Sequence, residues 1–344
     1  MKLGLELPAG RVPDHPLTFR PQPMERIWGG SKLKELFGKN FPTDRPIGES
    51  WEIADRPGAA SEITNGSFAG ATLPQLMSAF PEAMVGGFGR ADGRFPWLAK
   101  LLDAQDILSL QVHPPARLAA AMGGEPKSEI WYVAAAQPGA YVLAGLHPGV
   151  TRDEFETRSR NGDVMGCCQS LPVIAGDVLF VPSGRVHALG AGIVIFELQQ
   201  NSDTTYRVDD FGRKDLAGQP RKLHLEESLR AIDFSDFLPA LVPDRPNGIG
   251  PGIRRTLIQD PVFEATEIHG DPTHPISDLR RPASPGILAV VSGELTATGG
   301  GESVVLTAGG FCLLPARLSR AELICSRPTI VLQLTVGTAP SGPI

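Results

Sequence analysis

Two residues that could bind a metal stand one position apart in residues 109–114, which read SLQVHP. Residues i and i+2 of a β-strand share a face, so a strand here would offer the amide oxygen of Gln111 and the imidazole of His113 to one point. Histidine is the commonest metal ligand in proteins. A lone Gln-x-His pair is more often hydrogen-bonded than metal-bound, so its meaning depends on further ligands.

Two such ligands follow later in the chain. Glu129 interrupts the apolar segment of residues 128–133, where a buried carboxylate must pair, bind a metal or become neutral. His187 follows a glycine-containing turn. With Gln111 and His113 they form a set of two nitrogen and two oxygen ligands, which suits Zn²⁺ with an open position for water or a substrate oxygen.

Composition limits the class of protein. The 344 residues are enough for one large domain or two modest ones, and 42% hydrophobic with 20% charged residues allows a packed core. The 39 glycines and 32 prolines favour short strands and tight turns, hence a mainly β framework. A net charge of −6 argues against nucleic acid or an anionic membrane as partner, but a locally basic pocket still admits an anionic small molecule.

The cysteines and the hydropathy of the chain bear on the cellular location of the protein. The four cysteines include no CxxC pair, so we expect reduced thiols and a cytoplasmic protein. No apolar run reaches the roughly 18 residues of a membrane-spanning helix. Residues 1–4 do not begin a long apolar stretch, so no secretory signal is expected.

The hydrophobic pattern predicts mostly strands with a few short helices. Strands are expected at residues 48–55, 128–133, 178–182 and 193–198, with 141–145 as the neighbour of 128–133. Short helices are expected at 32–37, from a capping box at Thr151 to about residue 161, and at 223–231.

The sequence also contains a short internal repeat. Residues 175–183 resemble 308–316, and residues 130–133 resemble 288–291, which predicts two barrel-like units in tandem. The Pro- and Gly-rich residues 240–252 are the expected linker between a domain at 1–240 and one at 253–340. In the second unit Ile287 stands in place of Glu129 and Arg320 in place of His187, so we expect that unit to be free of metal.

Taken together, the motifs resemble those of type I mannose-6-phosphate isomerases (phosphomannose isomerases) of the cupin superfamily. They follow the family order and span about residues 20–215. The matching segments are IWGG at 27–30, GESWE at 48–52, SLQVHP at 109–114, KSEIWY at 127–132, VPSGRVH at 181–187 and ELQQNSDTTYR at 197–207.

This resemblance implies a mainly β fold of two cupin-like jelly-roll units with a few short helices. It implies interconversion of mannose 6-phosphate and fructose 6-phosphate, with a sugar phosphate as the ligand. We expect a monomer or weak homodimer. It implies one zinc ion per chain, held by Gln111, His113, Glu129 and His187. It also implies a catalytic Arg207 and a pocket lined by Ser109, Lys127 and Glu197.

Aldose–ketose isomerisation moves a proton between C1 and C2 of an open-chain sugar through an enediol. Glu197 is our first choice for the base, because partial burial on an apolar strand would raise its pKa. Arg207 could hold the phosphate or stabilise the enediolate. Lys127 is a further catalytic candidate, and both Lys127 and Lys100 are candidates for binding the phosphate.

Structural roles stand beside these assignments. Glu197 could be the ion-pair partner of an arginine, and Arg207 could pair with Asp209 or Asp210. Four other histidines have no comparable context and are expected to be structural or exposed: His147, His224, His269 and His274.

Two other functions fit part of the pattern. A cupin oxygenase would hold iron on two histidines and a carboxylate, although Gln111 as a fourth ligand counts against it. A non-catalytic cupin could bind a sugar phosphate, although the presence of Glu129, Glu197 and Arg207 counts against that.

Overall fold

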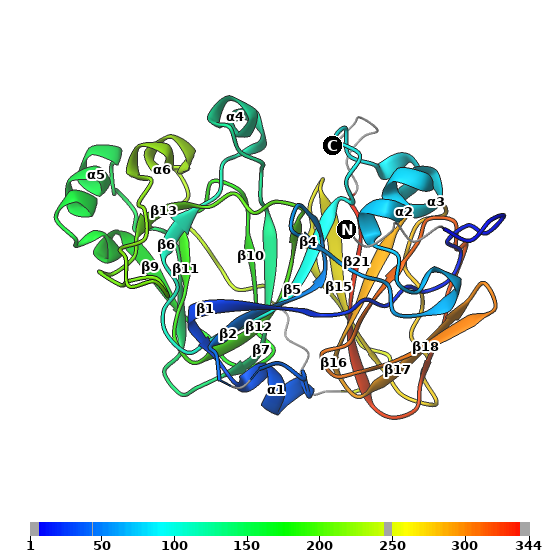
Figure 1. Ribbon diagram of the computed structural model, residues 1–344. Coiled ribbons are helices and arrows are strands. Elements are labelled where there is room, and N and C mark those ends of the chain that lie inside the picture. Colours follow the sequence, from blue (N-terminus) through cyan, green and yellow to red (C-terminus); the bar gives the residue numbers. More distant parts are fainter. Residues whose placement is uncertain (1–6, 43, 244–249, 338–344) are drawn as a thin grey trace.

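The structure, a computed structural model, describes residues 7–42, 44–243 and 250–337, and shows two β-rich halves side by side (Figure 1). It is mainly β with short helices, as the sequence predicts. Residues 1–4, residues 244–249 of the expected linker and residues 338–340 of the expected second domain lie outside the described residues. The four cysteines are free and buried.

A six-stranded antiparallel sheet crosses the first half in the order β1-β2-β5-β12-β7-β10. Every residue of β2, β5 and β12 is buried. Because other layers cover both faces, these strands do not alternate cleanly between apolar and polar residues. The bounds are Gln22–Gly30 (β1), Ile47–Ile53 (β2), Trp97–Ala104 (β5), Ile193–Gln200 (β12), Glu129–Ala136 (β7) and Val178–Val181 (β10).

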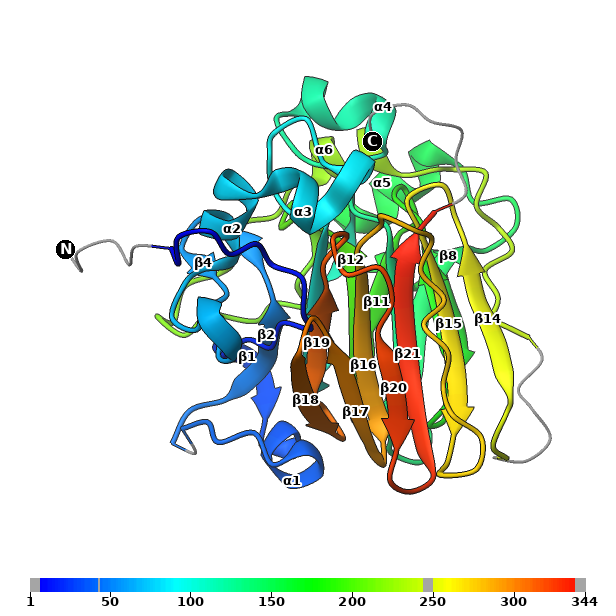
Figure 2. The ribbon, with the colours of Figure 1, turned by 90° about the vertical axis from the view of Figure 1, so that its right-hand side faces the viewer.

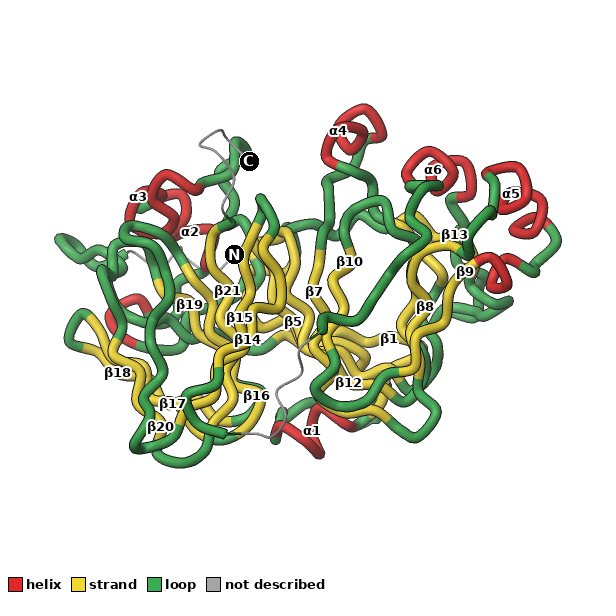
Figure 3. The backbone as a smooth tube through the Cα atoms, turned by 180° about the vertical axis from the view of Figure 1, so that it is seen from behind, coloured by secondary structure: helices red, strands yellow, loops and turns green. Residues whose placement is uncertain are grey.

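A five-stranded sheet packs on one face of the first (Figure 3). The two sheets enclose an apolar cluster that includes Trp131, Leu102 and Leu189. Its order is β13-β6-β11-β8-β9. The bounds are Tyr206–Asp209 (β13), Leu110–Val112 (β6), His187–Leu189 (β11), Tyr141–Leu146 (β8) and Cys168–Pro172 (β9). A two-stranded ribbon is formed by β3 (Asp55–Arg56) and β4 (Ala59–Ala60).

The predicted pairing of residues 141–145 with residues 128–133 is wrong. β7 pairs with β12 and β10, whereas β8 pairs with β11 and β9 in the other sheet. The turn between β7 and β8 therefore carries the chain from one layer to the other. Both edges of β7 are occupied by strands that come later in the sequence.

The described residues form six short α-helices, which lie at the ends and edges of the sheets. Glu154 N donates to the Thr151 hydroxyl at 3.2 Å, which confirms Thr151 as the N-cap of α5. No helix in the described part of the chain is long and apolar enough to cross a membrane. The bounds are Lys32–Phe37 (α1), Leu73–Ala79 (α2), Pro81–Val85 (α3), Ala116–Ala119 (α4), Arg152–Arg160 (α5) and Leu225–Ala231 (α6).

The second half is also two-layered (Figure 2). A five-stranded sheet, β14-β15-β21-β16-β19, packs on a three-stranded sheet, β18-β17-β20, around an apolar cluster. The bounds are Arg254–Gln259 (β14), Phe263–Gly270 (β15), Thr329–Val336 (β21), Gly286–Ser292 (β16), Phe311–Leu314 (β19), Glu302–Thr307 (β18), Glu294–Gly299 (β17) and Glu322–Cys325 (β20).

The internal sequence repeat corresponds to a strand pair that occurs in both halves. β10 pairs with β7 so that Val181 lies opposite Glu129, and β19 pairs with β16 so that Leu314 lies opposite Gly286. Gly286, rather than the predicted Ile287, therefore occupies the position equivalent to Glu129. A shift of one residue reverses the face of a strand, so this correction changes which side chain points inward.

The interior beside Gly286 is filled by an arginine. A Cβ at Gly286 would lie 2.5 Å from Cδ of Arg280, so only a residue without a side chain fits there. Arg280 pairs with Asp278 at 2.7 Å, and both side chains are buried. The second half thus carries the Arg280–Asp278 ion pair next to the position that Glu129 occupies in the first.

The two halves share one hydrophobic cluster between their large sheets. The ring of Phe196 on β12 lies 5.6 Å from that of Phe311 on β19 and 5.5 Å from that of Phe37. Leu17 also exchanges two backbone hydrogen bonds with Leu313, at 2.8 and 2.9 Å. The N-terminal segment therefore joins the second half, and the domain boundaries at 240 and 253 stay a prediction.

Removing the Phe196 ring should weaken this shared core. Phe196→Ala is expected to lower the free energy of unfolding by about 3–5 kcal/mol, because the ring is fully buried and leaves a cavity. Denaturant unfolding measures the change. Leu238→Ala, at a side chain that is 87% exposed, should change it by less than about 0.5 kcal/mol. Equal effects of the two variants would contradict the shared core.

Candidate metal centre

Three side chains converge between the two sheets of the first half. His113, Glu129 and His187 are fully buried, and each has a ligand atom within 4.8 Å of the others. Oε1 of Glu129 lies 3.7 Å from Nε2 of His113 and 3.4 Å from Nε2 of His187. Oε1 of Glu129 has no hydrogen-bond partner among the described residues. A buried carboxylate oxygen facing two imidazole nitrogens fits a divalent cation.

Strand pairing explains how distant residues meet. His187 opens β11 and lies directly opposite Gln111 in the centre of β6. His113 comes just after β6, on the same face as Gln111. Glu129 begins β7 in the other sheet. The Gln-x-His pair and His187 therefore come from one layer and the carboxylate from the layer opposite.

Backbone carbonyls orient both imidazoles. Nδ1 of His113 lies 2.8 Å from the carbonyl oxygen of Thr204, and Nδ1 of His187 lies 2.9 Å from that of Arg185. An N–H donated at Nδ1 leaves the Nε2 lone pair facing Glu129, which is the tautomer that binds metals. Burial lowers the pKa of His113 and lowers that of His187 to about 3, so both rings are neutral at pH 7.

Gln111 reaches the same centre, since its Nε2 atom lies 3.2 Å from Nε2 of His187. Rotation of the amide by half a turn puts its oxygen in that place, and an amide oxygen can bind a cation. The structure therefore brings together all four residues that the sequence singled out as candidate ligands.

A lysine balances the buried carboxylate. Nζ of Lys127 donates to Oε2 of Glu129 and lies 3.2 Å from Nε2 of His113. Burial alone would raise the pKa of Glu129, but Lys127 and the imidazoles hold it well below the ordinary value. Glu129 is thus ionised and ready to act as a ligand, with Lys127 at the edge of the centre.

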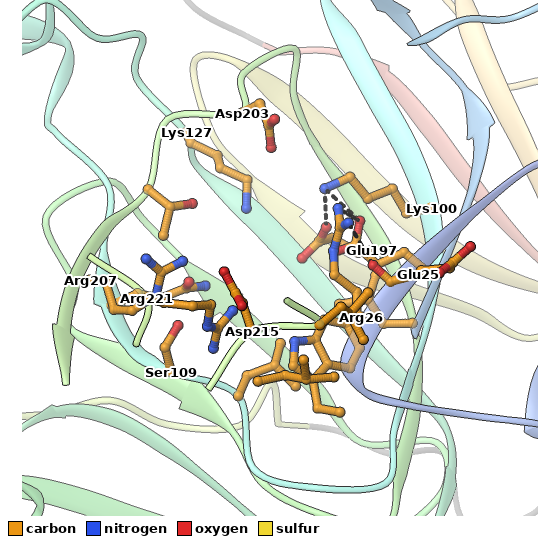
Figure 4. Close-up of a pocket in the computed structure, with 18 of the residues that line it drawn as sticks. Glu25, Arg26, Lys100, Ser109, Lys127, Glu197, Asp203, Arg207, Asp215 and Arg221 are labelled. Atoms are coloured by element: carbon orange, nitrogen blue, oxygen red, sulfur yellow. Dashed lines mark hydrogen bonds and ion pairs between the residues drawn. The ribbon is translucent and has the colours of Figure 1, made fainter. Parts of the chain in front are cut away.

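A pocket of about 610 Å³ opens next to this centre (Figure 4). Gln111 and Lys127 belong both to its lining and to the centre, so the pocket adjoins the candidate metal position. Its polar lining consists of Glu25, Arg26, Glu49, Lys100, Ser109, Gln111, Lys127, Glu197, Asp203, Thr205, Arg207, Asp215, Arg221 and His224. All the substrate-contact residues expected from the sequence are among them.

Glu197 lies on β12 and is buried. The indole N–H of Trp131 donates to Oε1 of Glu197 at 3.1 Å, and Nζ of Lys100 lies 3.2 Å from Oε2. Burial raises the pKa of Glu197, in the direction that the sequence predicts. The alternative that Glu197 pairs with an arginine is wrong about the partner, which is Lys100.

Arg207 lies on β13, across the pocket from Glu197 (Figure 4). Its Nη1 donates to the carbonyl oxygen of Lys222 at 2.9 Å, and its Nε is buried without a partner among the described residues. Asp210 pairs instead with Arg213 and Arg221, so the alternative pairing of Arg207 with Asp210 is wrong. Arg207 keeps its charge available to the pocket.

Sequence reasoning missed part of the lining. His224 was expected to be structural or exposed, but it lines the pocket, and its Nδ1 accepts the backbone N–H of Arg207 at 3.2 Å. Glu49 and Arg26 were given no role. Glu49 carries the same signal as Glu129, a carboxylate within a buried strand, and could have been found by it.

Comparisons with known proteins agree with this geometry. A family model described as "Phosphomannose isomerase type I, catalytic domain" matches residues 17–160. A mannose-6-phosphate isomerase from Streptococcus mutans is 36% identical over 308 residues, which are 87% of this chain and 92% of that protein. The crystal structure of the mannose 6-phosphate isomerase from Bacillus subtilis superimposes with a TM-score of 0.78 at 29% identity, covering 92% of this chain and 99% of that one.

A zinc-bound crystal structure of mannose 6-phosphate isomerase shares the fold as well. Its TM-score is 0.70 at 16% identity, and the match covers 94% of this chain and all of that one.

Glu129 should be required for metal binding. Glu129→Gln is expected to weaken Zn²⁺ binding by at least about 100-fold, because it removes the anionic ligand; competition with a chelator measures the affinity. Glu267→Gln is the matched control, since Glu267 is also buried and lies 2.6 Å from a histidine, His269, in the second half. A loss of Zn²⁺ that is equal in both variants would contradict the site.

Proposed function

This chain belongs to the type I mannose-6-phosphate isomerase family, and on that premise we propose that it interconverts mannose 6-phosphate and fructose 6-phosphate with one zinc ion per chain. The observation that carries the proposal is the buried set of Gln111, His113, Glu129 and His187 beside a pocket that contains both acidic and basic groups. A cytoplasmic location, a monomer or weak homodimer and the absence of nucleic-acid binding stay predictions.

The four ligands are proposed to hold zinc through two imidazole nitrogens, a carboxylate oxygen and an amide oxygen. Zinc bound there would supply a Lewis acid next to the sugar oxygens without redox chemistry. The unpartnered Oε1 of Glu129 and the neutral imidazoles support this assignment.

Glu197 is proposed as the base that moves the proton between C1 and C2 through an enediol. Its raised pKa supports the role, because a carboxylate with higher proton affinity accepts a proton from carbon more readily. Trp131 and Lys100 fix its two oxygens, so the carboxylate has a defined direction in the pocket.

Arg207 is proposed to bind negative charge on the substrate. The lysines of the pocket already face carboxylates, Lys100 at Glu197 and Lys127 at Glu129, whereas Arg207 donates to a neutral carbonyl. Its guanidinium therefore suits either the phosphate or the developing enediolate. Ser109, Lys127 and Lys100 are proposed as further substrate contacts.

The function is tested by direct turnover. Zinc-loaded protein is mixed with mannose 6-phosphate, and the formation of fructose 6-phosphate is followed. We expect turnover that a chelator removes and added zinc restores. The absence of turnover in zinc-loaded protein would contradict the proposed function.

Arg207 can be tested apart from the metal. Arg207→Ala is expected to lower kcat/KM at least about 100-fold while the zinc content stays the same, because its charge acts on the substrate. A rise in KM would place it at the phosphate, and a fall in kcat at the enediolate. Arg254→Ala, at an exposed position on β14, should change neither. Persistent turnover in Arg207→Ala would contradict the assignment.

A further inference from the structure

One lysine of the pocket lies between two buried carboxylates. Lys100 on β5 lies beside Glu197 on β12 (Figure 4), with its Nζ 3.2 Å from Oε2 of Glu197. The same Nζ lies 3.9 Å from Oε2 of Glu49 on β2. The same ammonium lies 4.9 Å from the ring centre of Trp51. The three charged side chains sit on neighbouring strands, because β5 pairs with β2 on one side and with β12 on the other.

Glu49 is the more firmly fixed of the two carboxylates. Arg26 binds it through two hydrogen bonds, Nε to Oε1 at 2.9 Å and Nη2 to Oε2 at 3.2 Å. The indole N–H of Trp51 donates to Oε2 at 2.6 Å. Burial opposes ionisation, but Lys100 and Arg26 lower the pKa of Glu49 to about 2. Glu49 is therefore a permanent negative charge in the wall of the pocket.

The single positive charge of Lys100 is thus shared between the carboxylates of Glu49 and Glu197. If Glu49 were neutral, the ammonium would be free to pair with Glu197 alone, and a complete ion pair stabilises a carboxylate against accepting a proton. The other charged groups that act on Glu197 are Lys127 and Glu129, which lie at the start of β7. Of these groups, Glu49 and Glu129 favour protonation of Glu197, and Lys100 and Lys127 oppose it.

We propose that Glu49 is a positioning residue for the isomerisation: it holds Lys100 between two carboxylates and so preserves Glu197 as a proton acceptor. The inference rests on the proposed function and goes beyond it, since Glu49 acts through Lys100 and is given no contact with the reacting carbons. Arg26 and Trp51 contribute to this positioning, because they hold the Glu49 carboxylate in place.

The same strand offers a matched control. Glu52 on β2 is also buried and pairs with a lysine, Lys39, at 2.7 Å. Glu52 does not belong to the lining of the pocket, whereas Glu49 does. If buried carboxylates on β2 have a purely structural role, Glu49→Gln and Glu52→Gln should change kcat and its pH dependence equally. If Glu49 positions Lys100, only Glu49→Gln should change them.

The experiment compares zinc-loaded wild type, Glu49→Gln, Glu49→Asp and Glu52→Gln. We measure zinc content, thermal unfolding, and kcat and kcat/KM for mannose 6-phosphate as functions of pH. Glu49→Gln is expected to lower kcat about three- to tenfold and to move the acidic limb of the kcat/KM profile to lower pH, because Glu197 becomes a weaker base. Glu49→Asp, which keeps the charge, should restore most of both properties.

Glu52→Gln should keep the wild-type pH profile and a kcat, per folded protein, within twofold of wild type. A Glu49→Gln profile that coincides with wild type, or an equal change in Glu52→Gln, would overturn the role of Glu49. The absence of turnover in wild type would instead refute the proposed function.

If wild type shows no turnover, the titration of Glu197 still tests whether Glu49 affects the proton affinity of Glu197. Its carboxyl carbon is followed by ¹³C NMR in protein labelled at glutamate, with Glu197→Gln to assign the signal. A midpoint at lower pH in Glu49→Gln than in wild type supports the inference, and an unchanged or higher midpoint refutes it.

Discussion

The carboxylate of Glu129 lies fully buried between two β-sheets, and a charge in such a place needs fixed compensation. Lys127 donates to one of its oxygens, and two neutral imidazoles face the other. None of these groups is adjacent to Glu129 in sequence, apart from Lys127 two residues earlier. The sheets must therefore keep their spacing and register, because a small shift would leave a buried charge without partners.

The second half of the protein helps to meet that requirement. Its five-stranded sheet covers the outer face of the six-stranded sheet, with Phe196 and Phe311 packed across the junction. A strand that is buried on both faces has little freedom to move, since packed interiors resist small displacements. The inner face can then carry Lys100, Glu197 and Glu49 in a defined arrangement. The second half thus supports the half that carries Gln111, His113, Glu129 and His187.

Charge alternates along the pocket wall, from Arg26 through Glu49 and Lys100 to Glu197. Each of these groups is held by a neighbour of opposite sign, so the wall is polar and yet rigid. Across the pocket, Arg207 has a backbone carbonyl as its partner. The two roles that we propose, proton transfer by Glu197 and anion binding by Arg207, therefore lie on opposite sides of one pocket.

The sequence by itself determined the mainly β class, the short helices and the four candidate ligands Gln111, His113, Glu129 and His187, because each depends on local pattern and residue chemistry. Only the tertiary structure decided that Lys100 pairs with Glu197, that Arg207 is not bound by Asp210, and that β7 and β8 belong to different sheets. Such pairings depend on distances between residues far apart in the chain. A strand's own sequence specifies which of its faces is polar, but its neighbours in the folded sheet decide which charge that face meets.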